Sequence, residues 1–165
     1  MGELRINAPR TDDVTGIGGN ACIPSSDGHV DIGSPENGSF RLWGSGIGSW
    51  WVENGTDHCC PGCTTTDLKR SVKIYLYHQR NYEGYVGYVL FGHVRSPLAD
   101  GGRNYAPSGD LIGYTPKDDC TDNCYDRTHL HTEAEPAPGV TLSVLVSYLQ
   151  SLTAGSTAVY KWTYP

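Results

Sequence analysis

The sequence predicts a mostly β protein built from antiparallel sheets, with long loops and one C-terminal helix. Two observations indicate this fold class. The chain contains 21 glycines and 11 tyrosines but only 18% charged residues, a composition typical of strands joined by frequent turns. In addition, several stretches alternate apolar and polar side chains, which is the period of a half-buried strand.

In the first half of the chain the expected strands are short and separated by turns. A polar, glycine-rich segment over residues 1–26 carries one short strand around Leu4–Ile6. Brief extended segments are then expected at 29–33, 39–44 and 46–55. The turn sequences "SPENG" and "NG" end the first and the last of these three segments.

The second half contains the longest predicted strands. Residues 71–79 and 83–94 alternate in polarity and are joined by "RNYEG", a connection of hairpin length. Shorter strands are expected at 111–116, 128–135 and 156–165. The stretches 71–79 and 83–94 therefore predict an antiparallel pair near the middle of the chain.

Two further segments receive a different assignment. Residues 95–110 are rich in glycine, proline and polar side chains, and we expect them to form a loop. Residues 140–152, "VTLSVLVSYLQSL", space their apolar side chains as an amphipathic helix does, with Thr141 or Ser143 as its cap. A pair of buried strands is the alternative for this second segment.

The length and charge of the chain limit its organisation and its partners. We expect an extended N-terminal arm over 1–26 and a single β-rich domain over 27–165, because no linker or repeat divides the rest. The formal net charge is −6 and no cluster of lysine and arginine is dense enough for a nucleic-acid partner. No apolar run approaches the roughly 18 residues of a membrane span.

The cysteines favour disulfides and therefore an oxidising compartment. They are even in number and clustered, and the disulfide candidates are Cys22, Cys59, Cys60, Cys63, Cys120 and Cys124. A structural zinc site at Cys60 and Cys63 is the alternative.

Two sequons in the chain make Asn37 and Asn54 glycosylation candidates. The first residues, "MGELRINAPR", lack the apolar region of a signal peptide. We therefore expect the mature form of a secreted protein, extracellular or periplasmic.

Histidines and aspartates at alternating positions indicate a candidate metal site. His129 and His131 share one face of a strand and lie roughly 6–7 Å apart at Cα. By the same rule Asp27, His29 and Asp31 share a face if their segment is extended. Imidazole and carboxylate ligands suit zinc. The alternative is that these histidines are simply exposed on a strand. For the His-x-His pair taken alone, this alternative is favoured over a metal site.

Four sequence motifs, taken in order, resemble the lysostaphin-type zinc endopeptidases, a family of bacterial cell-wall hydrolases. The motifs are "HVDIGSPENG", "YVLFGHV", "SGDLIGY" and "THLHTEAE", and the match covers residues 27–135. The resemblance implies a β-sheet sandwich with a central groove and a peptidase that hydrolyses peptide cross-links of peptidoglycan. One zinc ion per chain would polarise the scissile carbonyl and activate a water molecule.

The resemblance also implies a role for individual residues. Asp31 and His131 match zinc ligands, and His93 and His129 match the residues that act on the attacking water and on the oxyanion. Glu133 matches a carboxylate that supports a ligand from behind or has a structural role.

One position departs from the family pattern, since Asp27 stands where the family has a histidine ligand. Asp27 could replace the imidazole, His29 could take over the position, or the site could be inactive. If it is inactive, the alternative function is a non-enzymatic, glycosylated extracellular binding module or filament subunit. Residues 1–20 of the arm would then link neighbouring copies by strand addition.

Overall fold

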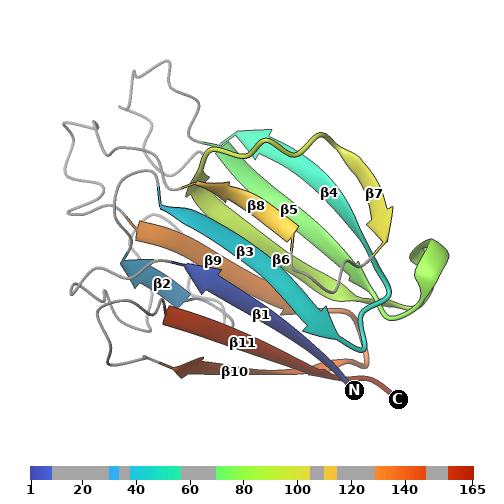
Figure 1. Ribbon diagram of the computed structural model, residues 1–165. Coiled ribbons are helices and arrows are strands. Elements are labelled where there is room, and N and C mark those ends of the chain that lie inside the picture. Colours follow the sequence, from blue (N-terminus) through green and yellow to red (C-terminus); the bar gives the residue numbers. More distant parts are fainter. Residues whose placement is uncertain (9–29, 34–37, 57–69, 105–109, 115–128, 148–155) are drawn as a thin grey trace.

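The computed structural model describes residues 1–8, 30–33, 38–56, 70–104, 110–114, 129–147 and 156–165. These residues form two antiparallel sheets and one short 3₁₀ helix, η1, at Arg80–Tyr82 (Figure 1). The expectation of a mostly β protein with antiparallel sheets is therefore confirmed.

The smaller sheet has five strands in the order β10-β11-β1-β3-β8. In chain order its strands are β1 (Gly2–Ala8), β3 (Ser39–Ser45), β8 (Asp110–Tyr114), β10 (Thr141–Ser147) and β11 (Ser156–Thr163). Strands from both ends of the chain thus lie side by side, with Gly2 opposite Trp162.

The larger sheet has six strands in the order β2-β9-β6-β5-β4-β7. In chain order its strands are β2 (Val30–Gly33), β4 (Ser49–Thr56), β5 (Arg70–Tyr77), β6 (Tyr85–Val94), β7 (Gly101–Asn104) and β9 (His129–Pro136). β5 and β6 are the antiparallel pair that the sequence predicted, and η1 lies in their connection.

Alternation along the strands separates the two faces of the six-stranded sheet. In β5, Val72, Ile74 and Leu76 are completely buried, whereas the intervening Lys73 and Tyr75 are partly exposed. Each buried aliphatic side chain contributes about 1.5–3 kcal/mol through removal of its surface from water. The inner face of this sheet therefore supplies the core, and its outer face is left for other contacts.

The two sheets share one hydrophobic core. The rings of Phe40 in β3 and Phe91 in β6 pack across it with centroids 5.2 Å apart. Beside them, Thr132 of β9 and Tyr160 of β11 form a buried hydrogen bond of 2.6 Å between their hydroxyls. These contacts place the inner faces of the sheets against each other (Figure 1).

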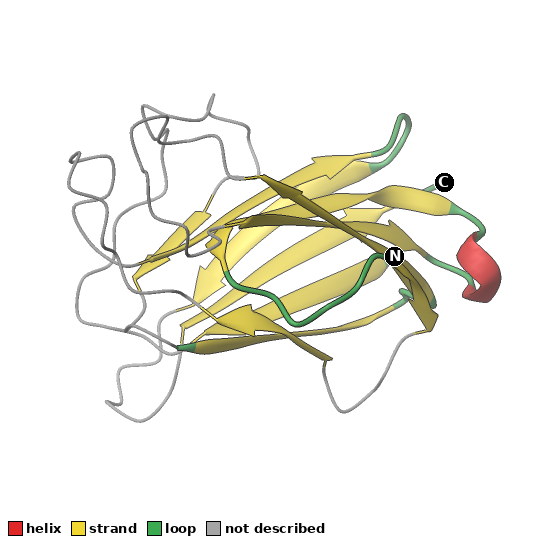
Figure 2. Cartoon of the chain, turned by 90° about the horizontal axis from the view of Figure 1, so that it is seen from above, coloured by secondary structure: helices red, strands yellow, loops and turns green. Residues whose placement is uncertain are grey.

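The chain termini and η1 lie at one end of the molecule (Figure 2). Side-chain contacts hold this end together, because the Tyr164 hydroxyl donates to the Gly46 carbonyl over 2.8 Å. The His78 ring packs on Tyr164 at a centroid separation of 5.0 Å. His78 therefore has a structural role at the end of β5.

The helix expected over 140–152 is wrong for residues 141–147, which form β10. Every residue of β10 is paired with β11, from Thr141 opposite Thr163 to Ser147 opposite Thr157. The segment 140–152 is rich in leucine and valine, and a short apolar run fits both helical and strand periods. The pairing with β11 favours the strand over the helix. A strand here agrees with the alternative interpretation of this segment.

The loop expected over 95–110 also contains a strand, β7, which pairs with β4 at the edge of the larger sheet. Its sequence, Gly-Gly-Arg-Asn, has no apolar alternation that could have indicated a strand. Backbone hydrogen bonds to β4 form this strand without help from a buried side chain.

The N-terminal arm expected over 1–26 is wrong for residues 2–8. These residues form β1, which is hydrogen-bonded to β11 on one side and to β3 on the other. The strand expected at Leu4–Ile6 is thus confirmed but belongs to the middle of a sheet. Residues 9–26 lie outside the described residues.

Candidate metal site

Three strands of the larger sheet bring the histidine motifs together. His131 in β9 lies opposite Asp31 of β2 on one side and opposite Gly92 of β6 on the other. Directly opposed residues of an antiparallel pair have Cα atoms about 4.5–5.5 Å apart. The register therefore sets Asp31 of β2 and Gly92 of β6 on either side of His131, although the three segments are widely separated in the sequence.

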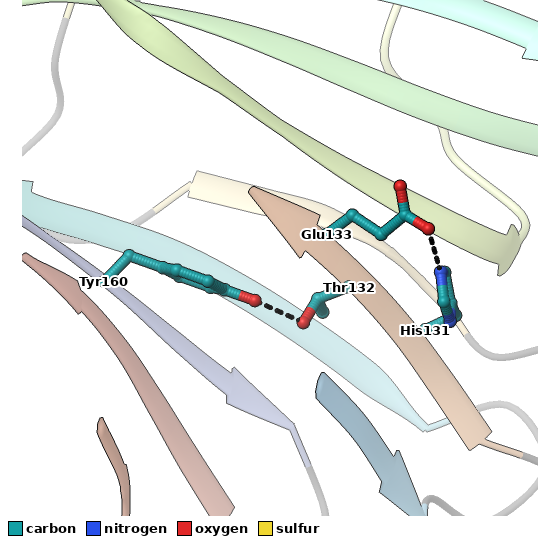
Figure 3. A network of polar contacts seen from close by, with 4 residues as sticks. All are labelled: His131, Thr132, Glu133 and Tyr160. Atoms are coloured by element: carbon teal, nitrogen blue, oxygen red, sulfur yellow. Dashed lines mark hydrogen bonds and ion pairs between the residues drawn. The ribbon is translucent and has the colours of Figure 1, made fainter. Parts of the chain in front are cut away.

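His131 is completely buried although it lies on the outer face of the sheet. Its neighbours in β9, Leu130 and Thr132, point into the core, and Thr132 bonds to Tyr160 there. Figure 3 shows His131 and Glu133 on the other side of the strand, away from Tyr160. The alternative of an exposed histidine on a strand is therefore wrong for His131, whose buried imidazole has a hydrogen-bond partner.

The contact between His131 and Glu133 sets the chemistry of the imidazole. The distance between His131 Nε2 and Glu133 Oε1 is 3.1 Å. An ionised carboxylate only accepts hydrogen bonds, so Nε2 carries the proton and donates it to Glu133. In the neutral ring the lone pair is then on Nδ1, which is the tautomer that a carboxylate behind a metal-binding histidine selects.

Gly92 allows the His131 ring to lie against β6, a role that the sequence reasoning missed. A Cβ atom at position 92 would lie 3.1 Å from Cδ2 and 3.4 Å from Cβ of His131. The first separation is tighter than an ordinary contact, so a side chain there would push the imidazole outward by a few tenths of an ångström. The sequence signal that could have indicated this is a glycine inside a predicted strand, which often marks close approach of another group.

A bulge in β6 adjoins the same position. Arg70 pairs with Val94 and Val72 with Phe91, so Gly92 and His93 together stand opposite the single residue Ser71. Phe91 and Val94 are both completely buried in the core, although three positions separate them. Bulges re-aim side chains and occur next to active sites, and here the bulge contains the candidate residue His93.

Of the other candidate residues, some lie within the described strands and others lie outside the described residues. His129 is the first residue of β9 and lies opposite Gly33. The structure gives the backbone positions of Asp31, His93 and His129. The remaining candidates lie outside the described residues: Asp27, His29, Asn37, Cys22, Cys59, Cys60, Cys63, Cys120 and Cys124. Within the described ranges, no group of three or more His, Cys, Asp or Glu residues could hold a metal ion.

Asn54, the second glycosylation candidate, has a structural role in β4. Its Nδ2 donates to the Leu98 carbonyl and to Asp100 Oδ1, each over 2.8 Å, and its backbone N–H donates to the same Asp100 oxygen over 2.8 Å. Because a glycan would be attached at Nδ2, it would displace one of these hydrogen bonds. In the folded chain the amide of Asn54 joins β4 to residues 98–100.

Comparison of the chain with protein-family models, with curated proteins and with solved structures gave no match. In the part of the chain that the structure describes, no helix is long and apolar enough to cross a membrane.

We expect Gly92→Ala to lower the free energy of unfolding by about 1–3 kcal/mol, the usual cost of adding a methyl group to a well-packed interior. The added Cβ would press on the His131 ring, which is completely buried and can shift outward only by displacing the atoms that cover it. Urea unfolding followed by circular dichroism measures the change.

Gly55→Ala is the matched control, because a Cβ there would come within 3 Å only of the Ser71 hydroxyl, which can rotate away. If both variants unfolded at the same urea concentration, Gly92 would not be needed to seat the imidazole.

Proposed function

We propose that the protein is a zinc-dependent endopeptidase of the lysostaphin type that hydrolyses peptide cross-links of the bacterial cell wall. The observation that carries this proposal is the register that sets Asp31 opposite His131, with Gly92 and the bulge at His93 on the next strand. A carboxylate and an imidazole from neighbouring strands form a donor pair that suits zinc.

The described residues fit such an ion in one further respect. Glu133 accepts a hydrogen bond from the Nε2–H of His131, so the lone pair of the neutral ring is on Nδ1. A zinc ion bound there would polarise the scissile carbonyl and lower the pKa of its water. We propose Asp31 and His131 as two ligands, with Asp27 or His29 as the third.

The remaining roles concern proton transfer and charge. We propose that His129 takes the proton of the attacking water and that His93 stabilises the oxyanion of the tetrahedral intermediate. Their backbones flank His131, one in β9 itself and one in the bulge of β6. In this proposal the imidazole of His129 supplies the general base and the imidazole of His93 supplies the electrophile, so no further catalytic side chain is required.

The finer description of the fold belongs to the same proposal. Two antiparallel sheets that share a core would form a sandwich, and the peptide would lie in a groove on the outer face of the larger sheet. An enzyme that acts on cell-wall peptide works outside the cytoplasm, where the proposed disulfides are stable. We therefore propose an extracellular or periplasmic location.

Metal analysis and a hydrolysis assay test the proposal on the unaltered chain. We expect one zinc per chain, release of peptide fragments from purified peptidoglycan, loss of that activity with a chelator, and its return with added zinc. A chain that holds no zinc would contradict the proposal. Zinc binding without hydrolysis would also contradict it and would favour the non-enzymatic binding module.

A further inference from the structure

A group of aromatic side chains lies on the outer face of the six-stranded sheet. We call it the aromatic surface, and its members come from β4, β5, η1 and β6: Trp51, Tyr75, Tyr77, Tyr82, Tyr85 and Tyr88. The rings form one series in the order Trp51, Tyr82, Tyr77, Tyr85, Tyr75 and Tyr88, with consecutive centroids 5.6–6.3 Å apart. At these separations each ring contacts the next.

The aromatic surface is unusually exposed for its composition. Trp51 is 44%, Tyr85 42% and Tyr82 39% accessible to solvent. Of the large hydrophobic residues that are exposed in the described part of the chain, only Met1 lies elsewhere. Hydrophobic side chains that are exposed as a group, and not singly, mark a contact surface.

Tyr82 is held in this surface against the preference of its backbone. Its φ of 64° lies in the left-handed region, which costs free energy for a residue with a bulky side chain. The Tyr82 N–H donates to Ser49 Oγ over 3.1 Å. The ring fills the space above Gly102, where a Cβ atom would lie 2.2 Å from the ring carbon Cζ. The fold thus keeps a strained residue in place and sets its ring against Trp51.

Carboxylates at the edge of the surface fix the phenol groups. The Tyr75 hydroxyl donates to Glu53 Oε2 over 3.3 Å, and the Tyr88 hydroxyl donates to Glu135 Oε2 over 2.5 Å. Burial, together with these carboxylates, raises the pKa of both phenols, so they remain protonated at neutral pH. The hydroxyls are therefore fixed hydrogen-bonding groups between the rings.

The charges around the rings indicate which kind of chain the surface accepts. Among the described residues, the carboxylates of Glu53, Glu133 and Glu135 act on the phenols of Tyr75 and Tyr88, and one ammonium group, that of Lys73, has its Nζ 4.5 Å from the centroid of the Tyr88 ring. The whole chain has a formal charge of −6. Such a surface repels polyanions, whereas its carboxylates accept hydrogen bonds from neutral hydroxyl groups.

We propose that the aromatic surface binds an uncharged polysaccharide chain. Sugar rings stack on the exposed faces of Trp51, Tyr82 and Tyr85, and their hydroxyls donate to Glu53 and Glu135. The apolar faces of sugar rings match flat aromatic rings, and the ring of hydroxyls around each sugar matches a border of fixed acceptors. Exposed aromatic rings and carboxylates that already hold neighbouring hydroxyls in place are the two features that such a partner requires.

The register relates this surface to the candidate metal site on the same face of the sheet. Tyr88 lies opposite Glu135, which is four residues along β9 from His131, or about 13 Å at 3.3 Å per residue. A polysaccharide on the aromatic surface would thus run beside the metal site. Binding itself requires neither a metal ion nor His131, so it is separable from the proposed hydrolysis.

Isothermal titration calorimetry of the full chain with cellohexaose and with the hexamer of N-acetylglucosamine tests the inference. We expect the unaltered chain and His131→Ala to bind at least one of these probes equally well. Trp51→Ala and Tyr85→Ala should each weaken binding roughly tenfold, as truncation of an aromatic anchor does. Tyr85→Phe keeps the aromatic ring, so this variant should lose much less binding affinity than Tyr85→Ala.

Tyr114→Ala is the matched control, since it removes a tyrosine of β8 in the other sheet. Thermal unfolding of each variant shows whether the fold is kept. The inference is overturned if neither neutral probe binds, or if Tyr114→Ala weakens binding as much as Trp51→Ala. It is also overturned if heparin binds in preference to both probes, or if Trp51→Ala instead dissolves a dimer of the chain.

Discussion

His131→Ala is expected to remove both the proposed zinc binding and the proposed hydrolysis of cell-wall peptide. The imidazole is completely buried, is oriented by Glu133, and lies between Asp31 and Gly92 in the register of the sheet. The adjacent residues of β9, Leu130 and Thr132, point into the core and cannot replace it. Metal content after gel filtration and fragment release from peptidoglycan measure the two losses.

Glu133→Gln provides a graded comparison. The amide can offer its oxygen to His131 Nε2, but it carries no charge to stabilise the metal-bound imidazole. Loss of such a carboxylate lowers metal affinity by about 10- to 100-fold in zinc enzymes. We therefore expect weaker zinc binding in this variant, measured by competition with a chelator, and complete loss only in His131→Ala.

His78→Ala is the matched control, since it removes an imidazole that packs on Tyr164 at the opposite end of the sheet. This variant should keep its zinc and its activity. If His131→Ala retained one zinc per chain, or if His78→Ala lost it, His131 would not be a ligand.

Phe91→Ala is expected to cause the largest loss of stability, about 3–5 kcal/mol, as for other buried phenylalanines. Phe91 is completely buried and packs on Phe40 between the two sheets. Alanine would leave a cavity that strands of two sheets cannot close without breaking their backbone hydrogen bonds. For a chain of this size the loss lowers Tm by about 6–20 °C, measurable by calorimetry.

Leu90→Ala is the comparison for this prediction, because Leu90 precedes Phe91 in β6 but lies partly exposed on the outer face. Its truncation should lower the free energy of unfolding clearly less than Phe91→Ala does.

Since Phe91 directly precedes Gly92, the cavity in Phe91→Ala should also loosen the bulge at His93. Equal melting temperatures for the two variants would show that the contact between the sheets contributes little to stability.

Local patterns were sufficient to predict most of the strands. In β5 the apolar positions recur at every second residue, and this period alone assigns both the strand and its buried face. The same alternation in β9 places His131 and Glu133 on one face. These predictions held because the inward side chains of each strand are apolar and are actually buried.

Local patterns failed where pairing decided the structure. β10 carries an apolar run that fits a helix, and β7 carries no apolar pattern at all, yet both pair along their length with a neighbouring strand. β1 was expected in an arm, but it is hydrogen-bonded on both sides. The free energy of a strand pair depends on a partner distant in the sequence, and no local window contains that partner.

The sequence by itself determined the β class and the faces of the long strands, and it is the source of the proposed zinc site at Asp31, His93, His129 and His131. Only the tertiary structure decided that Asp31 is paired with His131 in the register of the sheet, that Gly92 makes room for the imidazole, and that six aromatic rings from four elements form one surface. The physical reason is that the period of a strand is local, whereas its register depends on which buried surfaces and hydrogen bonds of distant segments fit together.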